Sequence, residues 1–145
     1  MIEQVKQIVR EASEIIKRAG DIAENTMAKE GTANYVTKYD LEVQKFLMKR
    51  LSETFEGCHF IGEEAGCDEN PVARGLTFII DPIDGTTNFI CRFQYSAISV
   101  GAVLDGEIVG GVVYNPYRGE MFWAEKGRGA YLNDTRLQPQ DGPLS

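Results

Sequence analysis

Basic residues are the minority charge in this chain. It carries 15 lysines and arginines against 22 aspartates and glutamates, a formal net charge of −7. Non-specific binding to nucleic acid or to an anionic membrane favours the opposite sign. Long apolar runs are also missing: no stretch approaches the length of a membrane span, and Glu3, Lys6 and Arg10 interrupt any signal-like opening. We therefore expect a soluble, cytoplasmic protein with no nucleic-acid or membrane partner.

Cysteine and histidine are scarce. The three cysteines, Cys58, Cys67 and Cys91, form no Cys-x-x-Cys pair and leave an odd count, which favours free thiols in a reducing cytosol. The single histidine, His59, directly follows Cys58, an arrangement that raises the alternatives of a nucleophile pair or a soft-metal site. Adjacent residues of a strand face opposite sides, so a structural role explains the pair better.

The first part of the chain predicts helix. With 145 residues, 43% of them hydrophobic and 26% charged, the chain is long enough for one globular domain with a core. Residues 2 to about 28 repeat apolar or small positions in steps of three and four, the pattern of one long amphipathic helix. This stripe consists of Ile2, Val5, Val9, Ala12, Ile16, Ala19 and Ala23.

A second helix is expected from Leu41 to about Phe55, with Asp40 as its N-cap. Between the two helices, Lys29–Asn34 has the composition of a loop. Tyr35–Lys38 has the composition of a short strand.

The later part of the chain is a run of strand patterns. Ala97–Leu104 and Glu107–Tyr114 are separated by Asp105-Gly106, a strong signal of a β-hairpin. The composition of Asn115–Gly119 predicts a turn. Residues 121–132 continue the strand pattern, with a break at 127–129. The predicted fold class is α+β: two long helices packed on a largely antiparallel β-sheet, with acidic strand ends at one rim.

The densest chemical signal is Asp-Pro-Ile-Asp-Gly-Thr-Thr-Asn-Phe at residues 81–89, entered from the apolar run 77–80. A buried strand that ends in two carboxylates offers the oxygen ligands that Mg²⁺ prefers. Gly85 lets the backbone approach a ligand, and free N–H groups of a helical turn at Thr86 and Thr87 would receive an anion. The acids do not alternate as in an EF-hand, and the Gly-Lys-Ser/Thr of a P-loop is absent. A plain surface turn explains this pattern less well.

A second acidic strand end lies upstream. His59–Ile61 reads as a short strand and is followed by Gly62, Glu63 and Glu64. If the two strands are neighbours, these acids meet the loop that begins at Asp81. On its own, the Glu-Glu pair is no more than a solvated acidic turn.

Gly-Glu-Glu at 62–64 together with the motif at 81–89 resembles the inositol monophosphatase family of Mg²⁺-dependent, Li⁺-sensitive sugar and inositol phosphatases. The resemblance implies that Glu63, Asp81 and the backbone carbonyl of Ile83 bind one metal. It implies that Asp81 bridges to a second metal held by Asp84. Two cations about 3.5–4 Å apart lower the pKa of a bound water and clamp a phosphate for in-line displacement.

The same resemblance implies the other roles at the site. Thr86 and Glu63 would orient the attacking water, and the N–H groups of Gly85 and Thr86 would receive the phosphate. Around the metals, it implies supporting positions at Lys29, Asp40 and Glu64, although Lys29 is equally explained as a solvated lysine and Asp40 as a helix cap. Many members have aspartate where this chain has Asn34, which argues against an additional metal there.

Full-length members of that family continue into a second α/β half of a layered αβαβα fold. Their Trp-Asp motif has no counterpart here, because Trp123 is followed by Ala124. We therefore expect a metal- and phosphate-binding domain over residues 1–137 and a linker-like tail over 138–145, in a chain that is either part of a longer protein or naturally short.

Two functions of different class follow. One is a phosphomonoesterase that acts on inositol monophosphate or a related sugar phosphate, and we expect it to be a homodimer. Fructose-1,6-bisphosphatase or nucleotide-phosphatase specificity is a lesser alternative. The other is a non-catalytic, metal-binding fragment that associates through the surface that a missing half would cover.

A third interpretation keeps the enzyme and changes the mechanism. Haloacid-dehalogenase phosphatases form a phosphoenzyme on the first aspartate of an Asp-x-Asp-Gly-Thr strand end. In this chain the spacing between Asp81 and Asp84 is one residue longer, which favours direct attack by water.

Overall fold

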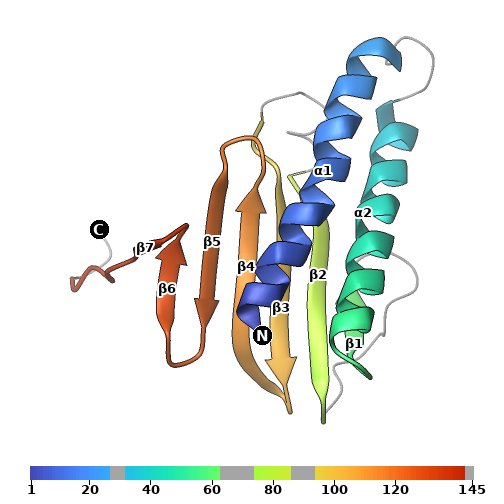
Figure 1. Cartoon of the computed structure of the whole chain (residues 1–145). Helices are drawn as coiled ribbons and strands as arrows, with labels where there is room; N and C mark the ends of the chain where they lie inside the picture. The colour runs from blue at the N-terminus through green and yellow to red at the C-terminus, as the bar shows by residue number, and fades with distance from the viewer. Residues whose placement is uncertain (27–31, 63–73, 86–93, 143–145) are drawn as a thin grey trace.

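In the residues that the structure describes, two helices lie on one face of a single sheet (Figure 1). The computed structural model describes residues 1–26, 32–62, 74–85 and 94–142, and between residues 20 and 37 it describes only the helical backbone. The helices are α1 (Ile2–Thr26) and α2 (Thr32–Thr54). The strands are β1 (His59–Gly62), β2 (Leu76–Asp84), β3 (Ala97–Leu104), β4 (Glu107–Asn115), β5 (Glu120–Glu125), β6 (Gly129–Leu132) and β7 (Thr135–Arg136).

The seven strands lie side by side in the order of the sequence. Strand β1 pairs with β2 in parallel, and every other pair is antiparallel. The predicted class, two long helices on a largely antiparallel sheet, is therefore confirmed. Among the described residues, neither helix combines the length and the apolarity that a membrane span requires.

Helix α1 buries the stripe that its periodicity predicts. Ile2, Val5, Val9, Ala12 and Ile16 are all buried, and together they form one core with the inner face of the sheet. That inner face is supplied by alternate residues of the strands, as the period of two requires. Its buried members include Phe78, Ile80, Ile98, Val100, Ala102, Val112 and Met121.

Helix α2 begins earlier than the sequence predicts. Its first residue is Thr32, so the expected strand at Tyr35–Lys38 is wrong and the expected loop at 29–34 is wrong from Thr32 onward. Asp40 lies inside the helix and is not its N-cap. β-branched and aromatic residues favour strands only weakly, and the tertiary context of a second long helix beside α1 outweighs that preference.

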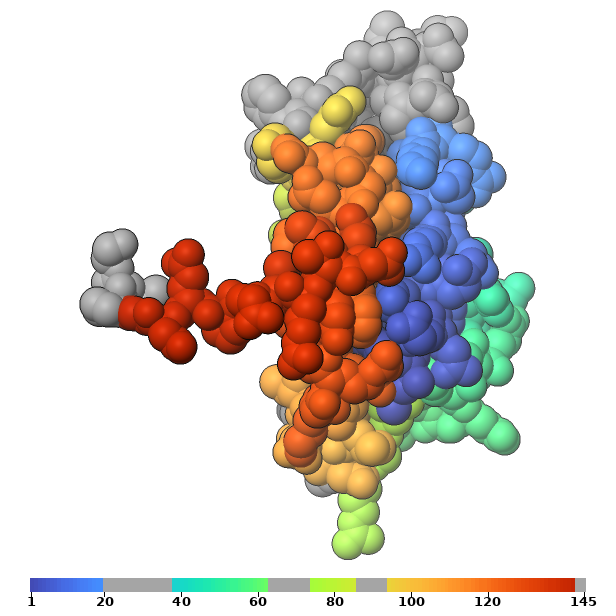
Figure 2. All heavy atoms as spheres, turned by 60° about the vertical axis from the view of Figure 1, so that its left-hand side comes forward, coloured from blue at the N-terminus to red at the C-terminus, as the bar shows by residue number. Residues whose placement is uncertain are grey.

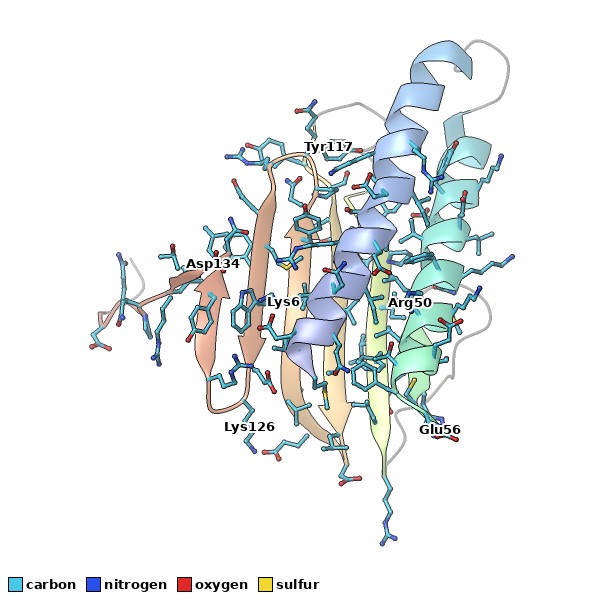
Figure 3. The ribbon with its side chains drawn as sticks, in the orientation of Figure 1. Lys6, Arg50, Glu56, Tyr117, Lys126 and Asp134 are labelled. Carbon is cyan, nitrogen blue, oxygen red and sulfur yellow. The ribbon has the colours of Figure 1, made fainter. Side chains whose placement is uncertain are left out.

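Specific contacts fasten the helices to each other and to the sheet. Arg50 of α2 donates from Nε to Oε2 of Glu11 in α1 at 3.0 Å, a contact that lowers the pKa of Glu11 (Figure 3). Lys6 lies over the ring of Trp123 in β5, with Nζ 3.9 Å from the ring centroid, and the same Nζ is 3.1 Å from Glu3. These contacts hold α1 across the middle of the sheet.

The hairpin and the turn that follows it form as the sequence predicts. Strands β3 and β4 are joined by Asp105 and Gly106, whose φ values of 51° and 82° match a type I′ turn. The turn between β4 and β5 is fixed by Asn115, whose Oδ1 accepts hydrogen bonds from the backbone N–H of Tyr117 at 3.0 Å and of Arg118 at 3.3 Å. Side-chain oxygens of asparagine commonly close turns in this way.

Within the part of the chain that the structure describes, no helix covers the other face of the sheet. Seen from the side, both helices lie on one side of the sheet and the segment after β7 projects from the other side (Figure 2). On that outer face the side chains of Ile79, Val113 and Phe122 are exposed. We call the surface formed by Ile79, Val113, Phe122 and Leu137 the bare face.

Phe78→Ala and Phe122→Ala compare the two faces of the sheet. Phe78 is 0% exposed and packs against Phe55 and Phe60, with ring centroids 5.3 and 6.2 Å away, whereas Phe122 is 42% exposed. We expect Phe78→Ala to lower the free energy of unfolding by about 3–5 kcal/mol and Phe122→Ala by less than about 1 kcal/mol, measured by urea denaturation. Equal losses would contradict the assignment of the core to the helix-covered face.

Candidate metal and phosphate site

The candidate site lies where β1 and β2 end together. Because the two strands are parallel, with Gly62 opposite Ile80, their carboxyl ends meet at the same edge of the sheet. In the sequence, Glu63 follows Gly62 and Asp81 follows Ile80. The neighbouring strands on which the sequence argument depended are therefore present. Glu63 and Glu64 themselves lie outside the described residues.

Strand β2 continues beyond the predicted 77–80 and reaches Asp84. Its pairing with β3 is not regular there: Asp81 lies opposite Ser99, and Asp84 lies opposite Ala97. Three steps along β2 thus correspond to two steps along β3, which means that β2 holds one extra residue, a β-bulge. Pro82 falls within it, at a position where a sheet tolerates a residue with no N–H to donate.

The bulge brings both aspartates to the same face. In a regular strand, residues three apart point to opposite sides of the sheet. Ala97 and Ser99 are two apart and share a side, and cross-strand partners such as Asp84 and Ala97 also share a side. Asp81 and Asp84 therefore project from the outer face of the sheet, away from the helices, with Asp81 partly exposed and Asp84 exposed.

Between the two aspartates, Ile83 is buried at 3% exposure. A buried side chain at this position anchors the bulge to the core, while its backbone remains at the rim. Gly85 follows with a φ of +83°, a conformation that glycine adopts without strain. Gly85, which has the widest choice of backbone conformations, therefore stands where the chain leaves the sheet.

The donor set of these residues fits a hard divalent cation. Two carboxylates on one face, with a backbone carbonyl between them, are oxygen ligands of the type that Mg²⁺ takes. Within the described ranges, no group of three or more histidine, cysteine, aspartate or glutamate side chains gathers as a complete metal cage. Of the predicted site residues, Lys29, Glu63, Glu64 and Thr86 lie outside the described residues, and Asp40 lies within α2.

The Cys58–His59 pair has no features of a nucleophilic site. Cys58 precedes β1 and is partly buried, and this burial raises the pKa of its thiol. A nucleophilic cysteine requires a lowered pKa, because the thiolate is the reactive form. The structural role expected for Cys58 is consistent with this environment.

Two polar residues near the site were not singled out by the sequence. Ser96 is buried at the start of β3 and donates from Oγ to the carbonyl oxygen of Gly85 at 3.3 Å. Asn115 donates from Nδ2 to the carbonyl oxygen of Gln94 at 3.3 Å. A serine between an aromatic and an apolar residue gives no motif, so only the pairing of β2 with β3 reveals its partner.

Comparison with known proteins shows the family of the chain. The model of the inositol monophosphatase family matches residues 1–145. The chain belongs to the inositol monophosphatase family. It is 39% identical over 133 residues to human inositol monophosphatase 1, which covers 90% of this chain and 48% of the human protein. It is 38% identical over 137 residues to inositol-1-monophosphatase of Bacillus subtilis, which covers 94% of this chain and 52% of that protein.

Solved structures of the inositol monophosphatase family share the fold. The extragenic suppressor protein suhB from Bartonella henselae aligns with a TM-score of 0.80 at 29% identity, over 97% of this chain and 54% of that one. Inositol monophosphatase II from Staphylococcus aureus aligns with a TM-score of 0.73 at 29% identity, over 91% and 51%. The chain spans about half the length of the curated relatives that it matches.

Gly85→Ala tests the backbone of the site. An alanine at a φ of +83° is strained, so we expect the free energy of unfolding to fall by about 1 kcal/mol in urea denaturation. Gly101→Ala is the control on the same sheet, because Gly101 has no positive φ and an added Cβ would meet the Cβ of Ile79 at an ordinary 3.8 Å. A loss at Gly101 as large as that at Gly85 would contradict the backbone assignment.

Proposed function

We propose that this chain is the metal- and phosphate-binding part of a Mg²⁺-dependent phosphomonoesterase. The observation that carries the proposal is the bulge in β2, which puts Asp81 and Asp84 on one face at the strand end in a chain of the inositol monophosphatase family. We propose that this domain extends over residues 1–137 and that residues 138–145 form a linker-like tail.

In this proposal Asp81, Asp84, the Ile83 carbonyl and Glu63 hold the metals. When bound, Mg²⁺ supplies Lewis acidity that activates water and neutralises charge on the phosphate. Thr86 and Glu63 orient the water, and the N–H groups of Gly85 and Thr86 bind the phosphate oxygens. Such positioning and charge stabilisation supply most of the catalysis needed for phosphoryl transfer. Direct attack by water leaves Asp81 unmodified, so no phosphoaspartate forms.

The net charge of −7 is compatible with an anionic substrate because bound cations reverse the local sign of the field. Two Mg²⁺ ions would bring four positive charges against the three negative charges of Asp81, Asp84 and Glu63, which would leave the rim attractive to phosphate. By the family resemblance, we also propose at least two Mg²⁺ per site and inhibition by Li⁺. A cytoplasmic location suits an enzyme of small phosphorylated metabolites.

The substrate class that we propose is inositol monophosphate or a related sugar phosphate. The relatives from human and Bacillus subtilis are named inositol monophosphatases, and solved structures of the Staphylococcus aureus relative are described as bound to inositol monophosphate and to 2′AMP. Because one of those structures contains a nucleotide, nucleotide-phosphatase specificity is our second choice of activity. Fructose-1,6-bisphosphate is the third.

Asp84→Asn tests the metal site. We expect it to lower Mg²⁺-dependent release of phosphate from inositol 1-phosphate by roughly 10²-fold or more, as the loss of one charge-stabilising group does elsewhere. Its stability without Mg²⁺ should match that of the wild type, because Asp84 is exposed. Asp134→Asn is the matched control. Asp134 is also an exposed aspartate, but it lies between β6 and β7, near the opposite edge of the sheet from β1 and β2 (Figure 3).

Calorimetry with Mg²⁺ accompanies the assay. If the wild-type 145-residue chain releases no phosphate but binds Mg²⁺, and Asp84→Asn weakens that binding, the chain holds the metal site but is not sufficient for turnover. If Asp84→Asn changes neither turnover nor Mg²⁺ binding, the proposal is wrong.

The bare face favours a second candidate function, association of the chain with itself. It exposes Ile79, Val113 and Phe122. Val113 and Phe122 also line a hollow of about 330 Å³, together with Gly101 and Gly111. Contiguous apolar surface of this kind marks an interaction site in soluble proteins. The homodimer expected from the sequence is proposed to form through this face when nothing else covers it.

Val113→Lys tests that association. We expect the wild-type chain to gain mass with concentration in light scattering and to bind an apolar dye, and Val113→Lys to shift it toward the monomer, because a charge on the bare face opposes its burial. Leu104→Lys is the control: Leu104 has the same 40% exposure but follows the alternation of β3 onto the other face. A wild-type monomer that binds no dye would contradict the association.

A further inference from the structure

Ser99 is the direct neighbour of Asp81 on the outer face of the sheet. The two residues lie opposite each other in the antiparallel ladder between β2 and β3, and both are partly exposed. Directly opposite residues of such a ladder share a face, with their Cβ atoms about 4.5–5.5 Å apart. The serine hydroxyl therefore stands beside one of the two carboxylates at the rim.

The backbone of Ser99 is held on both sides. Strand β3 lies between β2 and β4, and Ser99 is paired with Asp81 on one side and with Val113 on the other. Its neighbours along the strand, Ile98 and Val100, are buried at 0% and 1% exposure. A side chain carried by a strand that is anchored in the core is positioned more precisely than one carried by a loop.

Asp81 is the polar side chain directly opposite this hydroxyl. On the other side of Ser99, Val113 is apolar, and the residues two positions away along β3, Ala97 and Gly101, have no polar side chain. The diagonal neighbour on β4, Asn115, uses its side chain to fix the turn before β5 and to bond the carbonyl of residue 94. The surroundings of Ser99 thus point its hydroxyl to the carboxylate of Asp81.

An aspartate can accept a hydrogen bond while it binds a metal. An ionised carboxylate has two oxygens with about four acceptor sites, so a metal and other partners leave room for a further donor. A serine hydroxyl is such a donor, and rotation about one side-chain bond aims it. Bonds from a hydroxyl to an ionised carboxylate are short, about 2.5–2.7 Å, and stronger than neutral ones. The short serine and the longer aspartate can bridge their Cβ separation with a bond of this length.

The bulge makes the orientation of Asp81 important. The ladder is regular up to the pair of Asp81 with Ser99, and the pair that follows joins Asp84 to Ala97 across the extra residue. The carboxylate of Asp81 therefore stands at the last regular position of β2. Residues that hydrogen-bond to a metal-binding side chain fix its orientation, and losing them typically weakens metal affinity by about 10–100-fold.

We propose that Ser99 is a positioning residue for the metal site, because its hydroxyl donates to Asp81 and holds that carboxylate toward the bound metal. This inference rests on the proposed function of the rim and adds β3 to the elements that build it. Ser99 itself contacts neither metal nor substrate. The competing explanation is that water solvates this hydroxyl and that only the small size of the side chain matters.

Ser99→Thr and Ser99→Val form a matched pair. Threonine and valine have nearly the same shape and both favour strands, but only threonine keeps the hydroxyl. Binding of Mg²⁺ to each variant is measured by calorimetry, with Asp84→Asn as the reference for loss of the site. Urea denaturation without Mg²⁺ checks that both variants fold, which we expect because position 99 is partly exposed.

The expected results differ for the two variants. We expect Ser99→Val to weaken Mg²⁺ binding by roughly tenfold, and Ser99→Thr to stay within about twofold of the wild type. The low end of the usual range applies because Ser99 is partly exposed. The side-chain carboxyl-carbon NMR resonance of Asp81 is a second readout. At saturating Mg²⁺ it should shift in Ser99→Val and stay close to the wild-type position in Ser99→Thr.

The outcomes separate this inference from the proposed function. If Asp84→Asn weakens Mg²⁺ binding and Ser99→Val does not, the inference fails alone. Equal effects of the two Ser99 variants on Mg²⁺ binding, or an Asp81 resonance at the same position in both, also overturn it, because the hydroxyl would then have no part in the result. If the wild-type chain binds no Mg²⁺, or Asp84→Asn leaves that binding unchanged, the proposed function of the rim fails and the inference fails with it.

Discussion

The candidate site depends on one extra residue in strand β2. Without a bulge between Asp81 and Asp84, a period of two would send the two carboxylates to opposite faces of the sheet. With it, both face the same side, while Ile83 between them stays in the core. The bulge in turn depends on firm pairing of β2 with β1 and β3 and on the burial of Phe78 under the helices. Core packing and the placement of the two carboxylates are thus linked through the register of a single strand.

The two faces of the sheet differ in what covers them. Its two helices bury the inner face of the sheet through apolar side chains and through Lys6 above Trp123. The outer face carries both the aspartates of the rim and the apolar surface around Phe122. The candidate site and the exposed apolar surface therefore lie on the same face of the sheet.

Several elements were predictable because their signals are local. Asp105-Gly106 specifies a hairpin through the backbone conformations that these residues tolerate, and the stripe from Ile2 to Ile16 specifies a buried helix face. The start of α2 was not predictable in the same way. Tyr35 and Val36 favour strands as isolated residues, and Asp40 is a residue that often caps helices. The helix nevertheless begins at Thr32, because packing of a long helix outweighs both local preferences.

The site shows the same division. The motif at 81–89 identified the aspartates and Gly85 from residue types alone, but their common face follows from the pairing of β2 with Ala97 and Ser99, which no spacing reveals. Ser96 had no local signal at all, because its hydrogen-bond partner, Gly85, lies eleven positions away in the sequence. The metal and phosphate roles expected of the two aspartates, of Gly85 and Ile83, and of Glu63 and Thr86 all stay predictions.

The most direct test of this account is to locate the metal with a paramagnetic ion. Mn²⁺ replaces Mg²⁺ at oxygen sites and broadens the NMR signals of nearby amides. At low Mn²⁺ the account predicts that the amide signals of Gly62, Asp81, Ile83, Asp84 and Gly85 are lost first, together with those of Ala97 and Ser99 across the ladder. Broadening that begins at other acidic surfaces, such as Glu53 and Glu56 near the end of α2, and spares the end of β2 would contradict it.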